Sequence, residues 1–192
     1  MISFSAGAHP DLGTYEIRDD LITMPLWTKE FCAELVDFCN QQNQWIVDKS
    51  YNTEEVWLKE LDPALVVDYG DFYKRHVLPI IHKEWVILDF HGLMSPFILK
   101  YTMDGSRFIR NHSDFSIVTL HVKLNDRFTD GDVVFPRQGA SNKDVEVGHA
   151  VLFPSMVTHP HYSNPITSGE RYAFVSFTWH SGWDEGQRTY AF

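Results

Sequence analysis

The stretch "RNHSDFSIVTLHVKLN" (residues 110–125) decides how the chain is interpreted, because it joins a histidine–aspartate pair to an apolar strand. His112 and Asp114 are separated by one residue, and residues i and i+2 of an extended chain point to the same face. Both side chains can therefore reach one metal ion. Taken alone, His-x-Asp is a weak signal, since a hydrogen-bonded His–Asp pair at a strand end has the same pattern.

Short apolar runs flank this stretch and predict further β-strands from residue 95 onward. Turn clusters such as "MDGS" (103–106) and "NPITSGE" (164–170) separate them. Many short strands with turns between them are typical of a β-sandwich or jelly roll. The predicted strands are "PFILKY" (96–101), "FSIVTLHVKL" (115–124), "GDVVF" (131–135), "HAVLF" (149–153) and "RYAFVSFTWH" (171–180).

The region before the strands is predicted to be helical. Thr28 suits an N-cap, and Asp62 with Pro63 suits the start of a second helix, which Pro79 should kink or restart. We expect a single domain over residues 1–192, with a helical N-terminal part at about 1–94 and a jelly-roll core at about 95–180. The first helix would present one apolar stripe, made of Cys32, Leu35, Val36 and Cys39.

Composition restricts the class of protein. The 192 residues carry a formal charge of −10 without a cluster of basic residues, so we expect no nucleic-acid partner. The start of the chain lacks the pattern of a secretory signal, and no apolar run has membrane-spanning length, so we expect no membrane partner. Cys32 and Cys39 would lie roughly 10 Å apart along a helix, beyond disulfide reach. These features favour a cytoplasmic protein, and whether it forms a homodimer stays open.

The later stretch "THPHYSNPITSGERYAFVSF" (158–177) changes the interpretation of the His–Asp pair. A distal histidine, His159 or His161, would complete a two-histidine, one-carboxylate triad, which leaves open positions on a non-haem iron. A cosubstrate such as 2-oxoglutarate chelates that iron and keeps a second carboxylate that needs a fixed cation. Arg171 opens the strand after the distal histidines and offers two parallel donors in the geometry of a carboxylate.

Taken together, these motifs resemble the Fe(II)- and 2-oxoglutarate-dependent dioxygenases of the prolyl and lysyl hydroxylase group, in particular the catalytic domain of procollagen lysyl hydroxylases. The resemblance lies in "KYTMDGSRFIRNHSDFSIVTLHVKLN" (100–125), "FTDGDVVFPR" (128–137), the stretch 158–177 and the helical segment "FCAELVDFCNQQNQW" (31–45). It implies a double-stranded β-helix with supporting N-terminal helices. It covers most of the chain, and the combined motif is specific although its parts are not.

The resemblance also assigns roles to residues. In this family the metal-binding histidine lies ten residues before the cosubstrate arginine, which selects His161, not His159, as the third ligand beside His112 and Asp114. His159 would then contact a ligand or line the substrate mouth, or be an ordinary polar residue. The cosubstrate would be bound by Arg171, Tyr101, Thr119 and His121, the last standing where lysyl hydroxylases usually have asparagine.

The implied activity is hydroxylation with Fe(II), 2-oxoglutarate and O2, supported by ascorbate, with succinate and CO2 as by-products. Peptidyl lysine is the favoured substrate, and Asp104, Asp130 and Asp132 are expected near the pocket. Alternatives are a prolyl 4-hydroxylase or a free amino-acid hydroxylase. An alternative of another class is a non-catalytic, cupin-like jelly roll that binds a metal or ligand. A metal-dependent hydrolase would leave Arg171 unexplained.

Overall fold

The computed structural model describes residues 2–86, 92–179 and 190–191. Its helices are α1 (Lys29–Gln42), α2 (Leu58–Leu61), α3 (Pro63–His76) and α4 (Leu78–Trp85). Its strands before the His–Asp pair are β1 (Glu16–Arg18), β2 (Leu21–Pro25), β3 (Ile46–Val47), β4 (Glu54–Trp57), β5 (Gly92–Leu93) and β6 (Phe97–Tyr101). The later strands are β7 (Val118–Lys123), β8 (Phe128–Asp130), β9 (Val133–Phe135), β10 (Ala140–Ser141), β11 (His149–Pro154), β12 (Tyr162–Ser163), β13 (Ile166–Gly169), β14 (Arg171–Trp179) and β15 (Tyr190–Ala191).

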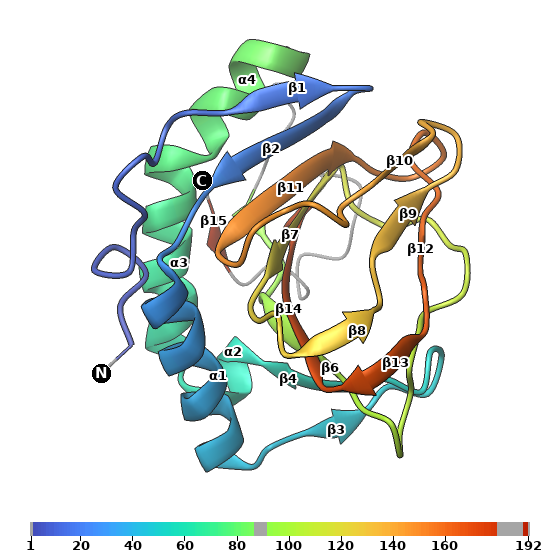
Figure 1. The fold of residues 1–192 in the computed structure, drawn as a ribbon. Coiled ribbons are helices and arrows are strands. Elements are labelled where there is room, and N and C mark those ends of the chain that lie inside the picture. The colour runs from blue at the N-terminus through green and yellow to red at the C-terminus, as the bar shows by residue number, and fades with distance from the viewer. Residues whose placement is uncertain (1, 87–91, 180–189, 192) are drawn as a thin grey trace.

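One large antiparallel sheet organises the molecule. Its strands follow the order β1-β2-β11-β7-β14-β6-β4-β3, and β5 joins it through β14 and β15. The helices α1, α3 and α4 lie along one side of this sheet, whereas the small sheets β10-β9-β12 and β13-β8 lie along the other (Figure 1). The small sheets and the inner face of the large sheet therefore enclose the space in which the predicted site residues meet.

The central strands are buried on both faces, which explains why their sequences are nearly continuous apolar runs. Phe174 and Val122 point to the helices and have no exposed surface, and the ring of Phe174 lies 4.9 Å from that of Trp27. The alternate residues face the small sheets: Val151 and Phe153 pack against the β9 side chains in a second cluster. A residue's position along a strand thus decides whether it stabilises the core or faces the site.

The helix boundaries agree with the sequence patterns. Thr28 accepts a hydrogen bond from the Phe31 amide at 3.2 Å, and Asp62 accepts one from the Ala64 amide at 2.9 Å. The second helix ends at His76 and a new helix begins at Leu78, so Pro79 stands in a first turn, where a missing N–H costs nothing. None of the helices in the described ranges is both long and apolar enough to cross a membrane.

The N-terminal part is not purely helical, which differs from our expectation. It supplies β1 and β2 to one end of the large sheet and β3 and β4 to the other. These strands are short, and β1 and β3 are exposed along their length. Their pairing is settled by partners far along the chain, such as β11 for β2, and a local pattern does not carry that information. The last residue of the predicted strand 171–180 lies outside the described residues.

Candidate metal centre

A pair of backbone hydrogen bonds holds His112 and His161 side by side. The amide of His112 donates to the carbonyl of His161 at 2.9 Å, and the amide of His161 donates back at 2.8 Å. Residues that exchange both bonds in an antiparallel bridge carry their side chains on the same side. The two rings accordingly lie with centroids 4.4 Å apart, although the residues belong to the loop before β7 and the segment before β12.

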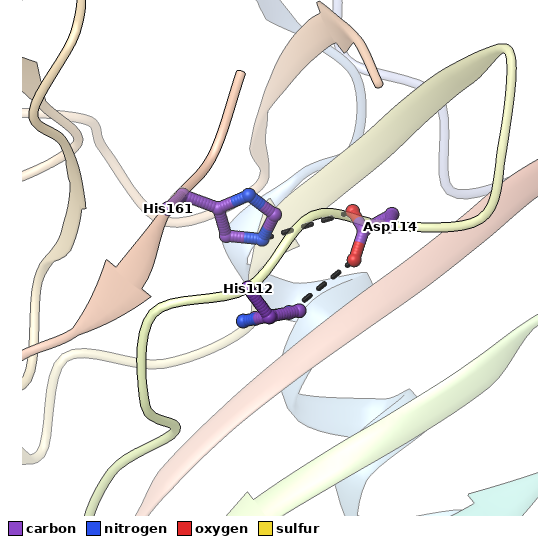
Figure 2. Close-up of side chains that lie close together, drawn as sticks. All are labelled: His112, Asp114 and His161. Carbon is purple, nitrogen blue, oxygen red and sulfur yellow. Dashed lines mark ion pairs between the residues drawn. The ribbon is translucent and has the colours of Figure 1, made fainter. Parts of the chain in front are cut away.

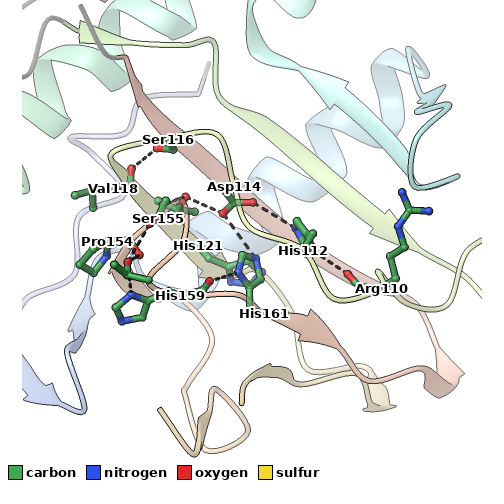
Figure 3. Close-up of polar contacts among 12 residues, drawn as sticks. Arg110, His112, Asp114, Ser116, Val118, His121, Pro154, Ser155, His159 and His161 are labelled. Carbon is green, nitrogen blue, oxygen red and sulfur yellow. Dashed lines mark hydrogen bonds and ion pairs between the residues drawn. The ribbon is translucent and has the colours of Figure 1, made fainter. Parts of the chain in front are cut away.

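Backbone carbonyls fix which nitrogen each ring presents. His112 Nδ1 lies 2.9 Å from the carbonyl oxygen of Arg110, and His161 Nδ1 lies 3.1 Å from that of His159 (Figure 3). A carbonyl only accepts, so both Nδ1 atoms carry the hydrogen and donate it. Both Nε2 atoms are therefore free to bind a metal ion, in the arrangement that metal-ligating histidines commonly adopt.

Asp114 faces both of these nitrogens. Its Oδ1 lies 3.3 Å from His112 Nε2, and its Oδ2 lies 3.7 Å from His161 Nε2 (Figure 2). One ligand atom from each of the three residues falls within 4.8 Å of the others. Thr119 on β7 donates its hydroxyl to Asp114 Oδ2 at 2.8 Å and so fixes the carboxylate against the large sheet. The donor set of two imidazoles and one carboxylate fits Fe(II) and leaves positions open.

The electrostatics of the three residues favour a cation. Burial alone would raise the pKa of Asp114, but the hydrogen bond from His112 and the charges of the two histidines lower it below its usual range. Burial lowers the pKa of His161, although the charge of Asp114 opposes this. Burial would also lower the pKa of His112, yet its interaction with Asp114 raises it. A positive charge beside Asp114 thus stabilises the buried carboxylate, and a metal ion would supply that charge.

Arg171 lies on the inner face of the large sheet beside two other predicted site residues. It pairs with Tyr101 across β14 and β6, and its guanidinium carbon lies 4.6 Å from the centre of the Tyr101 ring. Its Nη2 donates to His121 Nε2 at 3.1 Å. Burial, and then the charge of Arg171, lower the pKa of His121 to about 3, so this histidine is neutral and its Nε2 accepts.

The guanidinium of Arg171 is buried, and the described residues offer it no counter-ion. Its side chain is only 3% exposed, and Nη1 has no hydrogen-bond partner among the described residues. No carboxylate in the described part of the chain pairs with it within 4 Å. A buried charge without a partner is costly, so an anion is expected in this place. Arg171 also lines a separate pocket near β8 and β9.

A cavity of about 330 Å³ joins the three metal-binding side chains to these residues. Tyr101, Thr119 and His121 line it, so each predicted site residue either borders the cavity or, as Arg171 does, contacts residues that border it. The rest of the wall is mainly aromatic and aliphatic. It includes Tyr51, Trp57, Phe97, Leu99, Ile109, Val133, Phe153, Val175 and Phe177.

His159 takes no part in the cluster through its ring. The residue is 1% exposed, and its ring packs near those of Phe135 and Phe153, with centroids 6.4 and 6.1 Å away. It lies outside the strands, and its backbone carbonyl accepts the hydrogen bond from His161 Nδ1. Thr158 lies beside its Nδ1 at 3.0 Å.

The acidic residues expected around the pocket lie elsewhere. Asp104 is exposed in the turn after β6, and Asp130 and Asp132 border the separate hollow near Arg171. The hydroxyl of Thr167 donates to Asp130 at the end of β8, and the side-chain amide of Asn164 donates to Asp132 between β8 and β9. The expectation that these three border the pocket was wrong, because none of them lines the cavity beside His112, Asp114 and His161.

Besides Asp114, the acidic residues that line the cavity are Asp48 and Glu55, which sequence reasoning missed. They come from the β3–β4 hairpin, together with Tyr51 and Trp57. We expected this part of the chain to be helical and singled out no site residue in it. From the sequence, the two-residue spacing of Glu55 and Trp57 could have shown that both lie on one face of a strand. It could not have shown that this face lines the cavity.

Known proteins were compared with the chain. No family model matches it. The chain is 28% identical over 182 residues to a procollagen lysyl hydroxylase and glycosyltransferase of Acanthamoeba polyphaga mimivirus, which covers 87% of this chain and 20% of that protein. It is 25% identical over 173 residues to human procollagen-lysine,2-oxoglutarate 5-dioxygenase 2, which covers 82% of this chain and 23% of that protein. The chain thus spans less than a quarter of the length of these relatives.

Among solved structures, a prolyl-4-hydroxylase of Pseudomonas putida superposes with a TM-score of 0.67 at 19% identity, over 90% of this chain and 96% of that chain. This likeness confirms the double-stranded β-helix fold. The relatives confirm the resemblance to procollagen lysyl hydroxylases over most of the sequence.

Proposed function

We propose that this chain is an Fe(II)- and 2-oxoglutarate-dependent dioxygenase that hydroxylates an amino-acid side chain of a peptide, with lysine as the favoured target. One observation carries the proposal. His112, Asp114 and His161 present three potential metal ligands to the cavity, and the buried guanidinium of Arg171, whose Nη1 has no partner among the described residues, contacts residues that line the same cavity. The relatives named as procollagen-lysine dioxygenases support both the reaction and lysine.

Each site residue has its own role in the proposed reaction. His112, Asp114 and His161 would hold the iron, which together with 2-oxoglutarate and O2 supplies the oxidation and releases succinate and CO2. Arg171 would bind the far carboxylate of 2-oxoglutarate through Nη1, since His121 already accepts from Nη2. The ring of Tyr101 packs against the guanidinium and stabilises it by a cation–π contact. The apolar cavity wall keeps bulk water away from the reacting carbon.

The test begins with the protein, Fe(II) and 2-oxoglutarate under anaerobic conditions. We expect the weak visible charge-transfer band of an iron-bound 2-oxo acid, and succinate formation once O2 is admitted. His112→Ala and His161→Ala should abolish both signals and iron retention. His159→Ala should keep the iron, because the carbonyl that orients His161 belongs to the backbone. Loss of iron in His159→Ala with retention in His161→Ala would overturn the assignment of ligands.

Arg171→Ala tests the cosubstrate. Removing one partner of a buried charge pair costs about 3–5 kcal/mol, so affinity for 2-oxoglutarate should fall about 100-fold or more. Arg171→Lys should recover part of it, since an ammonium restores the charge but not the guanidinium geometry that lets Nη2 donate to His121 while Nη1 binds the carboxylate. Unchanged 2-oxoglutarate binding by calorimetry would exclude this role for Arg171.

The second candidate is prolyl hydroxylation, which the structural likeness to the Pseudomonas putida prolyl-4-hydroxylase favours. Mass spectrometry after incubation with Fe(II), 2-oxoglutarate and ascorbate separates the substrates. The three to compare are a lysine-containing collagen-like peptide, its proline-rich counterpart and free lysine. A gain of one oxygen on peptidyl lysine alone supports lysine, whereas oxidation of the proline-rich peptide alone supports the second candidate.

We also propose, as a separate point, that the protein works in a reducing compartment such as the cytoplasm. Cys32 and Cys39 are buried free thiols on α1, and burial raises the pKa of each to about 12. Thiols of this kind are packing residues without a tendency to form disulfides.

A further inference from the structure

The β3–β4 hairpin gives the cavity an acidic side that the proposed chemistry does not use. Glu55 and Trp57 lie on the inner face of β4, in register with Leu99 and Phe97 of β6. These in turn pair with Ala173 and Val175 of β14, on the face where Arg171 lies. Glu55 therefore points into the cavity from the same layer of side chains as the predicted cosubstrate residues.

The carboxylate of Glu55 is held in place but not neutralised. The residue is 8% exposed, and Trp57 Nε1 donates to its Oε1 at 3.0 Å. In the ranges that the structure describes, no lysine or arginine approaches this carboxylate within 4 Å. Burial raises the pKa of Glu55, and the nearby charge of Asp48 raises it further, although the Trp57 hydrogen bond opposes this. The site thus favours a cation from outside the protein.

Asp48 has a different task. Its Oδ1 accepts the amides of Ser50 and Tyr51, both at 2.8 Å, and so shapes the turn between the two strands. This turn brings the ring of Tyr51 to 5.0 Å from that of His112, at the side of the metal-binding cluster. The hairpin therefore connects the acidic side of the cavity with the reaction centre, since Tyr51 and Glu55 both line it.

The shape and charge together fit a long basic side chain. Its methylenes would lie against Trp57, Phe97 and Phe177, which line the cavity, while its charged end would meet Glu55. A proline ring offers no charge and would leave the buried carboxylate without a partner. An acidic side chain would be repelled.

From this geometry we infer that Glu55 is a specificity-determining residue, which pairs with the ammonium group of a lysine side chain of the substrate. The inference rests on the proposed function and deepens it, because it names the group that selects the substrate. Trp57 positions the carboxylate through its indole hydrogen bond.

Two collagen-like peptides test this inference, one with lysine and one with norleucine, which keeps the methylenes and lacks the ammonium. Binding is measured by calorimetry on protein loaded with Mn(II) and 2-oxoglutarate, so that the readout does not need turnover. The unaltered protein should bind the lysine peptide about 10–100-fold more tightly, the effect of one charge-assisted hydrogen bond. Glu55→Gln keeps the oxygen that accepts from Trp57 and should abolish this preference, with little change for norleucine.

The matched control is Glu54→Gln. Glu54 precedes Glu55 on the same strand, faces away from the cavity and opposes Lys100, so the same change of charge should leave the lysine preference intact. Equal binding of both peptides to the unaltered protein, or an unchanged preference in Glu55→Gln, would overturn the inference. The proposed function is read separately from 2-oxoglutarate decarboxylation without peptide. If the protein did not decarboxylate 2-oxoglutarate but still preferred the lysine peptide through Glu55, the proposed reaction would be refuted. The inference that Glu55 binds the ammonium group would still hold.

Discussion

Thr119 donates a hydrogen bond to Asp114 Oδ2 at 2.8 Å, and its own oxygen lies 2.7 Å from the hydroxyl of Ser155. All three side chains are buried. The sequence placed Thr119 among the residues expected to bind the cosubstrate; in the structure its hydroxyl donates to the candidate metal ligand Asp114. Thr119 thus orients a ligand, because a carboxylate with a fixed hydrogen bond cannot rotate away from the metal.

Thr119→Val removes the hydroxyl and keeps the shape of the side chain. Partners of metal ligands commonly contribute about 10–100-fold to metal affinity, so we expect a loss of this size in a titration with Fe(II) or Mn(II). Thr119→Ser is the matched control and should retain most of the affinity, since it keeps the donor. Full affinity in Thr119→Val would show that packing alone orients Asp114.

At this scale the sequence selected His112, Asp114, His161 and Arg171 as candidates, and the structure places the first three on one cavity and Arg171 against residues that line it. Spacing alone left His159 and His161 as alternatives, and only the family resemblance separated them. The hydrogen bond from Arg171 to His121 was not foreseen, because it joins the inner faces of two neighbouring strands and depends on rotamers that a sequence does not encode.

Among the elements, the turn after β8 shows how backbone geometry supports Arg171. Gly131 has φ of +77°, and a Cβ there would lie 2.6 Å from Ile166 Cγ2 and 3.2 Å from Arg171 Cδ. Only glycine combines this backbone with so close an approach. The aliphatic part of Arg171 is therefore held against the turn between β8 and β9, which connects the two small sheets.

Gly131→Ala should lower stability by about 1–3 kcal/mol, which lowers the Tm by roughly 2–12 °C for a chain of this size. It should also weaken 2-oxoglutarate binding, because the added methyl group displaces the side chain of Arg171. Gly139→Ala is the control: φ is +64° there as well, but nothing lies within 4 Å of the added Cβ. If both variants had a lower Tm and unchanged 2-oxoglutarate binding, Gly131 would be required only for the backbone conformation of the turn.

The elements that the sequence missed share a physical cause. The strands β1 to β4 are short and partly exposed, and β2 and β4 join the large sheet through β11 and β6, which are distant along the chain. Local periodicity identifies a strand only where many of its residues are buried, as in β7 and β14. For this reason the central strands were predicted, while the hairpin that carries Glu55 was not.

In the whole molecule, the candidate metal ligands lie where the large sheet meets the small sheet β10-β9-β12. His112 and Asp114 belong to the loop before β7, Thr119 fastens Asp114 to the large sheet, and His161 leads into the small sheet through β12. A metal ion would link the large sheet to the small one. Arg171 on β14 would then make 2-oxoglutarate a second link, from the cluster to the large sheet.

This arrangement predicts an ordered thermal stabilisation. A ligand at a hundredfold excess over its Kd stabilises the folded state by about 2.7 kcal/mol, or roughly 5–11 °C in Tm at this chain length. Mn(II) alone should raise the Tm of the unaltered protein and of Arg171→Ala equally, since Arg171 does not touch the metal ligands. 2-Oxoglutarate should add a second increase only when Mn(II) is present, because chelation supplies part of its affinity, and Arg171→Ala should lose that second increase alone. His161→Ala should lose both. Differential scanning fluorimetry on the three proteins separates these outcomes, and an equal 2-oxoglutarate shift with and without Mn(II) would mean that 2-oxoglutarate binds away from the metal.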